Sequence, residues 1–91
     1  MTTDLIGRAR AGDAEAFTEL VNRHLGLVYT AALRQVRSPH QAEDIAQTVF
    51  TNLARHAGKL SPDTNLTAWL YRATRNAAVD VIRTEARRAA R

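Results

Sequence analysis

The sequence predicts an all-α domain, a compact bundle of three main helices preceded by a short N-terminal helix. Its apolar residues recur at spacings of three and four, and no segment alternates with the period of two that is typical of strands. Four glycines and two prolines are the strong helix breakers in 91 residues, so the predicted helices are long. A hydrophobic content of 45% supports one modest core, which is mostly aliphatic because aromatic residues make up 5%.

The first two helices are separated by a glycine and an aspartate. We expect a short helix over about residues 3–11, closed by Gly12. A long helix follows over about residues 14–37, with Asp13 as its N-cap and Gly26 as a candidate bend. Nine apolar positions at helical spacing predict its buried side: Phe17, Leu20, Val21, Leu25, Val28, Tyr29, Ala32, Leu33 and Val36.

The third helix has a clear start signal. Ser38 is a candidate N-cap, Pro39 takes the first helical position, and Gln41 can complete a capping box. We expect the helix to end near residue 55 or 56, with Gly58 as the stop. Six apolar side chains form its predicted inner face: Ala42, Ile45, Ala46, Val49, Phe50 and Leu53.

A loop is predicted over residues 56–65, where Gly, Pro, Ser, Asp and Asn gather. The last helix then runs from about residue 64 to about residue 88. We expect Trp69, the single tryptophan, to belong to the core together with Phe17, Tyr29 and Phe50. Six residues form the predicted inner stripe of this helix: Leu66, Trp69, Leu70, Ala73, Ala77 and Val81.

Charge is distributed unevenly along the chain. The formal net charge is +4, and from Arg72 onward there are six arginines against two acids. A cationic C-terminal third is typical of a phosphate-binding surface, although a solvated helix face with a fraying tail has the same composition. The outward face of the third helix differs, because it carries the acids Glu43 and Asp44 and uncharged polar groups. Its single basic residue is Arg55, near the end of the helix.

Several classes of function receive no support from the residues. The chain has no cysteine, no apolar run near the roughly 20 residues of a membrane span, and no signal-peptide pattern, so we expect a cytoplasmic protein without membrane contact. His24, His40 and His56 form no pair with metal-ligand spacing, and the glycines form no phosphate loop. We therefore expect no enzyme activity, no cofactor, no metal and no small-molecule substrate.

Three segments in order resemble one family. AEDIAQTVFTNL resembles a sigma-factor helix in which Asp, an aliphatic residue, any residue and Gln recur. TAWLYRATRNAAVDVIRTEARR resembles the helix that follows it, and GDAEAFTELVNRHLGLVYTAALR is similar to the first helix of the same domain. Together they cover Asp4 to Arg88 and resemble region 2 of the bacterial extracytoplasmic-function (group IV) sigma factors. The resemblance implies that residues 1–91 are a region 2 domain, a fragment without the region 4 helix-turn-helix.

The resemblance implies a polymerase-binding face on the third helix. In the family this helix docks on the clamp helices of the polymerase β′ subunit, which present basic side chains. Asp44 and Gln47 lie three apart on one face, and Thr51 continues the ridge. Thr48 departs from the pattern, because many relatives carry an acid there, which removes one expected salt bridge. The alternative is that Glu43, Asp44 and Gln47 only favour the N-terminal half of the helix through its dipole.

By resemblance, Lys59 to Asn65 within this loop correspond to the specificity loop of the family, which receives a base flipped out of the minus-ten promoter element. Flipping a base costs a few kcal/mol, so the loop must offer hydrogen bonds in return. Asp63 could instead start the last helix. The resemblance implicates five loop residues in DNA binding: Lys59, Ser61, Asp63, Thr64 and Asn65.

The last helix presents an outer ridge for DNA. By resemblance Arg72 and Arg75 lie where relatives contact the upstream duplex edge of the minus-ten element, with Asn76 and Arg83 on the same side. Asn76 could instead hydrogen-bond Asp80, which could pair with Arg83. Three further arginines are predicted nonspecific phosphate contacts or a frayed, solvated end: Arg87, Arg88 and Arg91.

The resemblance therefore predicts a transcription-initiation function without catalysis. The expected partners are core RNA polymerase through β′ and promoter DNA, whose minus-ten element the domain would recognise and help to melt, with an anti-sigma factor as a further partner. The alternative is a sigma-like helical module that binds an anti-sigma factor or another regulator without recognising a promoter. A helix-bundle enzyme is a third class, which no residue pattern supports.

Overall fold

The computed structural model describes residues 2–61 and 63–90, with side chains from Leu5 onward. This part of the chain is helical and contains no strand, which confirms the predicted all-α class. Its elements in chain order are α1 (Thr2–Arg10), α2 (Ala14–Val36), α3 (Pro39–His56), the 3₁₀ turn η1 (Ala57–Lys59) and α4 (Leu66–Ala89).

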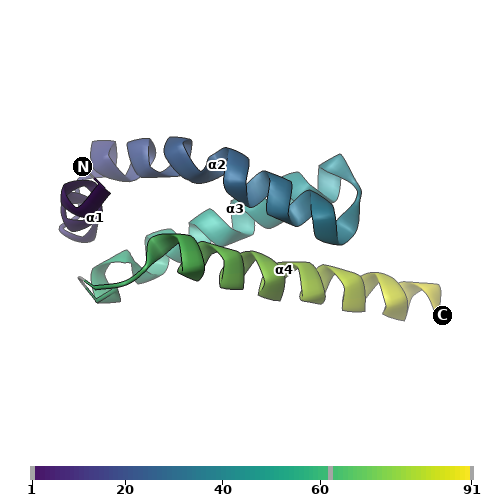
Figure 1. Cartoon of the computed structure of the whole chain (residues 1–91). Coiled ribbons are helices and arrows are strands. Elements are labelled where there is room, and N and C mark those ends of the chain that lie inside the picture. Colours follow the sequence, from purple (N-terminus) through teal and green to yellow (C-terminus); the bar gives the residue numbers. More distant parts are fainter. Residues whose placement is uncertain (1, 62, 91) are drawn as a thin grey trace.

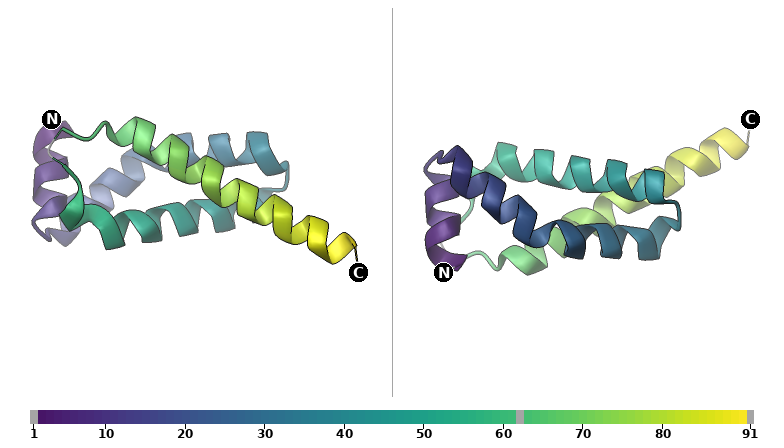
Figure 2. Two further views of the ribbon diagram at one scale, coloured as in Figure 1. Left: turned by 90° about the horizontal axis from the view of Figure 1, so that it is seen from below. Right: turned by 90° about the horizontal axis from the view of Figure 1, so that it is seen from above.

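The three long helices form one elongated bundle. α2 and α3 lie antiparallel and side by side, and α4 packs against both of them (Figure 1). α1 crosses one end of the bundle, where it contacts α2 and η1 (Figure 2). The C-terminal end of α4 extends past the turn between α2 and α3, so the molecule measures 47 × 22 × 20 Å.

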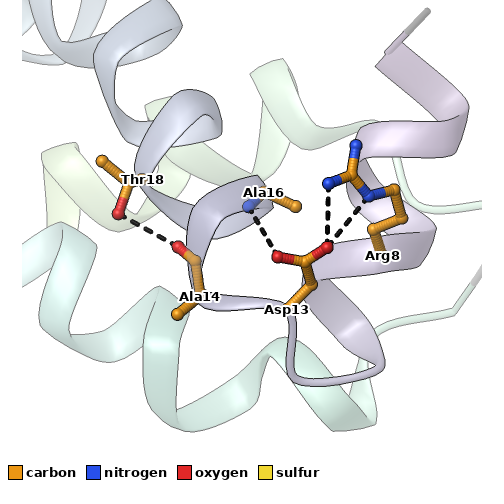
Figure 3. A network of polar contacts seen from close by, with 5 residues as sticks. All are labelled: Arg8, Asp13, Ala14, Ala16 and Thr18. Atoms are coloured by element: carbon orange, nitrogen blue, oxygen red, sulfur yellow. Dashed lines mark hydrogen bonds and ion pairs between the residues drawn. The ribbon is translucent and has the colours of Figure 1, made fainter.

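An ion pair closes the corner between α1 and α2 (Figure 3). Gly12 turns the chain with a positive φ of 97°, and Asp13 then caps α2 by accepting a hydrogen bond from the Ala16 N–H at 3.1 Å, as predicted. The Arg8 guanidinium donates to the other Asp13 oxygen from Nε at 3.0 Å and from Nη2 at 2.8 Å. The Ala16 N–H and then Arg8 stabilise the carboxylate and lower the pKa of Asp13, while Asp13 raises the pKa of Arg8.

The turn between α2 and α3 takes two residues. Arg37 adopts a left-handed conformation with φ of 62° and donates its N–H to the Leu33 carbonyl, which ends α2. Ser38 caps α3, with its hydroxyl oxygen 3.4 Å from the Gln41 N–H. The return bond of a capping box, from the Gln41 side chain, is absent among the described residues, so that half of the prediction is wrong.

The predicted inner face of α3 is confirmed, because all six of its side chains are buried. In α2 the prediction is correct for Leu20, Val28 and Ala32, and five other residues of its stripe are half-buried against the core. The prediction that Leu25 is buried is wrong, because 45% of the residue is exposed. The α2 stripe spans a wider arc than one core contact can cover, so part of it faces outward. α2 also continues through Gly26 without a break.

The start of α4 differs from its prediction. The helix begins at Leu66, and the Asn65 side chain caps it by accepting from the Ala68 N–H at 3.1 Å. Gly58 is not a left-handed stop, because the chain continues from α3 into η1 through this residue. The fully buried positions of α4 are Leu66, Leu70, Thr74 and Ala78.

The buried stripe of α4 is therefore rotated from the predicted one. Trp69, Ala73, Ala77 and Val81 are half-buried at its edge, so Trp69 belongs to the core only in part. Thr74 was missed because it is polar. Its hydroxyl donates to the Leu70 carbonyl at 2.7 Å, which satisfies the group inside the core and makes the buried threonine tolerable.

Candidate functional site

The exposed face of α3 is a crest between two grooves. Glu43, Asp44, Gln47, Thr48 and Thr51 are all exposed. The groove on one side lies between α2 and α3, and the groove on the other side lies between α3 and α4. A partner that lies along the crest would therefore contact α3 and one or both of its neighbours.

The groove between α2 and α3 is apolar and open, with a volume of about 930 Å³. Its α2 wall includes Leu25, which is exposed, and Tyr29, which is half-buried. Its α3 rim carries Glu43, Gln47 and Thr51. The groove thus combines an apolar floor with one acid and two neutral polar groups, a composition suited to an amphipathic helix with basic flanks.

Asp44 lies on the other side of the crest. It borders a groove with Asp80 and Thr84 of α4, and its Oδ2 lies 3.6 Å from Nε2 of His40 one turn earlier. Both side chains are largely exposed, so this pair contributes little to stability and leaves Asp44 able to accept from a partner. Asp44 and Gln47 are neighbours on α3, as predicted, but they border different grooves.

Thr48 lines the central part of the groove between α3 and α4, which has a volume of about 270 Å³. Asn52 and His56 continue the α3 wall, and the α4 wall includes Trp69 and Asn76. The half-buried indole therefore faces a groove that contains two amide side chains. Aromatic and amide groups of this kind can stack on nucleobases and hydrogen-bond their edges.

The predicted specificity loop is held by short-range hydrogen bonds. The Asp63 N–H donates to the Ser61 hydroxyl at 3.2 Å, and the Thr64 N–H donates to the Ser61 carbonyl at 3.0 Å. Asp63 is exposed and does not start α4, because Asn65 has that role. Asn65 is therefore held in place by capping through Oδ1, while its amide nitrogen keeps both donors for a ligand. Lys59, at the end of η1, is exposed beside the loop.

The outward face of α4 carries exposed arginines. Arg72, Arg75 and Arg83 form no ion pair with any described residue, so their charge is available to an anionic partner. Asn76 is exposed on the same side of α4 as Arg72 and Arg83, and it also lines the groove between α3 and α4. Among the described residues the structure contains neither a hydrogen bond between Asn76 and Asp80 nor an ion pair between Asp80 and Arg83.

The end of α4 has a different electrostatic character. Arg88 lies 3.8 Å from Glu85, an exposed pair one turn apart. Arg87 is exposed, and the prediction for Arg91 falls outside the described residues. Arg87 and Arg88 therefore extend the exposed basic surface toward the end of α4.

Leu25 and Tyr29 were missed as candidate functional residues because they were assigned to the core. The width of the α2 stripe could have indicated that part of it faces outward, since nine apolar positions exceed what one buried face needs. Trp69 was likewise assigned to packing. Its place at the edge of the groove depends on how far α4 is rotated against α3, which periodicity does not specify.

Comparison with known proteins identifies the family and the fold. Residues 20–88 match the Sigma-70 region 2 family. The chain is 31% identical over 78 residues to the ECF RNA polymerase sigma factor SigW of Bacillus subtilis, covering 86% of this chain and 42% of that protein. It is 35% identical over 72 residues to the ECF RNA polymerase sigma factor SigE of Mycolicibacterium smegmatis, covering 79% of this chain and 28% of that protein. The chain thus spans less than half the length of both relatives.

A solved structure has the same fold. An engineered region 2 of sigmaE, determined by NMR in complex with GTAAAA, superposes with a TM-score of 0.89 at 28% identity and covers 97% of this chain and 92% of that one. None of the described helices is long and apolar enough to cross a membrane.

Proposed function

The chain belongs to the Sigma-70 region 2 family, and from that premise we propose that it binds core RNA polymerase and recognises and helps to melt the minus-ten promoter element. The observation that carries the proposal is the family match over residues 20–88, which includes both the crest of α3 and the exposed arginines of α4. The role is one of binding, without catalysis by this chain.

The polymerase-binding surface in this proposal is the crest of α3 with the adjoining apolar groove. Asp44 accepts charge-assisted hydrogen bonds from basic side chains of the β′ clamp helices, and Gln47 both donates and accepts. Leu25 and Tyr29 provide apolar area beside these polar contacts. Thr48 weakens the surface relative to an acid at that position, because a threonine cannot form an ion pair.

The DNA-binding surface in this proposal extends from the loop along α4. Arg72, Arg75 and Arg83 bind phosphates, and Lys59 does so at the start of the loop. Ser61, Asp63 and Thr64 offer polar groups to an unstacked base, with the free amide nitrogen of Asn65. The structural relative, an engineered region 2 of sigmaE, was determined in complex with GTAAAA, which supports a nucleic acid as the ligand class here.

An anti-sigma factor is a further proposed partner. Such a regulator would cover the same crest and groove and so compete with the polymerase. The alternative, a module that binds only a regulator, predicts no affinity for core polymerase or for single-stranded DNA. Measurable binding of core polymerase or of single-stranded DNA would therefore distinguish the proposed initiation function from a module that binds only a regulator.

The first experiment changes Asp44→Ala and Gln47→Ala together and measures affinity for core RNA polymerase and for an isolated β′ clamp-helices fragment. We expect a loss of affinity of about tenfold or more, with an unchanged melting temperature because both side chains are exposed. The matched control changes Glu19→Ala and Gln35→Ala, an exposed acid and an exposed amide on α2 outside the groove. Equal affinity of the test and control variants would contradict the polymerase interface.

A further inference from the structure

Two apolar residues flank the polar loop residues Ser61, Asp63, Thr64 and Asn65. Leu60 directly precedes Ser61 and is half-buried, and Leu66 directly follows Asn65 and is 5% exposed. Both line one small cavity of about 10 Å³, which holds no more than one water molecule. Because the two flanking residues meet in the same packed cluster, the chain between them must form a closed loop.

α1 provides one wall of that cluster. Ile6, Ala9 and Arg10 line the cavity from α1, opposite Leu53 and Ala57. Figure 2 shows α1 and the segment that leads into α4 at the same end of the bundle. Contact continues along the backbone, since a Cβ on Gly58 would lie 3.9 Å from the Arg10 carbonyl oxygen. α1 therefore packs directly on the segment that leads into the loop.

The loop itself is a short, internally bonded turn. The two hydrogen bonds to Ser61 hold Asp63 and Thr64 against it, and Asn65 is fixed as the cap of α4. The loop can therefore change its position mainly through its two flanking residues. Leu66 is held by α4, so the variable position is that of Leu60, which α1 supports.

We infer that α1 is a positioning element for DNA recognition, and that Leu60, which lines the same cavity as Ile6 of α1, sets where the loop meets an unstacked base. This inference rests on the proposed function. Leu60 is a positioning residue, since it acts through Ser61 and its neighbours rather than by touching DNA. If Leu60 shifts, the polar groups of the loop lose their alignment with the base edge while the crest of α3 is unaffected.

The test measures selectivity as well as affinity. A single-stranded oligonucleotide is first selected from a random pool by the parent chain, and each of its bases is then substituted in turn. We expect Leu60→Ala and Ile6→Ala each to reduce discrimination at one base position by about fivefold or more, with affinity for core polymerase unchanged. Leu60→Met, which retains the apolar volume, should restore discrimination.

The matched control is Leu33→Ala, at a half-buried leucine packed against the core in the last turn of α2. It should lower the melting temperature without changing base discrimination. The inference is overturned if Leu60→Ala and Ile6→Ala retain the discrimination of the parent, or if Leu33→Ala reduces it equally. If Leu60→Ala does not fold, the inference is tested by the base discrimination of Ile6→Ala, which should fall, and of Leu60→Met, which should match the parent. A parent chain that selects no oligonucleotide overturns the proposed DNA-binding function and this inference with it, whereas a selecting parent with unaffected variants overturns the inference alone.

Discussion

Single polar residues in this chain serve the fold and the proposed surfaces with different atoms. Asn65 was predicted to bind DNA, yet its side-chain oxygen caps α4, which leaves the donors of its amide nitrogen for a ligand. Asp13 is committed wholly to the fold, with one oxygen bound to the Ala16 N–H and the other to Arg8. In both cases the residue type indicates a hydrogen-bonding side chain. Which atom it bonds is decided by the nearby backbone, through the Ala68 N–H for Asn65 and the Ala16 N–H for Asp13.

The Asp13 cap makes stability depend on pH. The pKa of Asp13 is lowered in the folded state from its ordinary value of 3.8, so the charged carboxylate stabilises the fold above about that pH. This stabilisation is lost as the pH falls through 3.8 toward the lower folded value. We therefore expect Asp13→Asn, which keeps a cap but loses the charge, to melt several degrees below the parent at pH 7.

The difference should narrow when both proteins are melted at successively lower pH below about 4. Arg8→Gln is the complementary variant, since it removes the other half of the ion pair and should show the same narrowing. A melting-temperature gap that stays constant from pH 7 to pH 3 would contradict the role of the Asp13 charge.

At the scale of whole elements, α2 serves two purposes. Leu20, Val28 and Ala32 pack into the core, while Leu25 and Tyr29 line the groove beside α3. An apolar stripe that is wider than one helix contact can cover indicates a helix with two apolar neighbours. For α2 one neighbour is the core of this domain, and under the proposed function the other is the polymerase.

A matched pair of substitutions tests the outward part of the α2 stripe. Leu25 is 45% exposed in the groove, and Ile82 is 47% exposed on α4 outside every groove described above. We expect Leu25→Asn to weaken binding to core polymerase by about tenfold, or about 1.4 kcal/mol, because it places an amide against apolar partner area. Ile82→Asn should leave that affinity unchanged, and both variants should melt near the parent temperature.

Affinities measured by competition against labelled parent chain would resolve this difference. Retention of full affinity by Leu25→Asn would restrict the interface to the polar crest of α3. Equal weakening by both variants would indicate nonspecific contact.

At the scale of the whole molecule, charge is divided between helices. The crest of α3 is acidic and neutral, and the outward face of α4 is basic, although the chain as a whole is cationic with a net charge of +4. Two partners of opposite charge can therefore bind one small bundle at the same time, which initiation requires if polymerase and promoter are both held. The division also predicts that the two surfaces act independently.

The salt dependence of DNA binding tests the basic surface. Replacing Arg72→Ala and Arg75→Ala together should weaken binding to a forked minus-ten duplex and reduce the slope of log affinity against log salt by about 1.8, since each lost phosphate contact contributes about 0.9. Affinity for core polymerase should not change. Arg23→Ala with Arg34→Ala, at exposed arginines on α2, is the control. An unchanged salt slope in the test variant would contradict phosphate contact by this part of α4.

The sequence by itself determined the helical class, the caps at Asp13 and Ser38, and all six inner residues of α3. These follow from periodicity and from side chains that bond backbone atoms within three residues, so no distant part of the chain is needed to specify them. The tertiary structure decided how far α4 is rotated, which leaves Thr74 buried and Trp69 at a groove, and which side of α2 lacks a neighbour inside the domain. Those outcomes depend on the side-chain volumes and crossing angles of three helices packed together. The spacing of apolar residues along one helix does not specify which neighbouring helix packs against each of its faces.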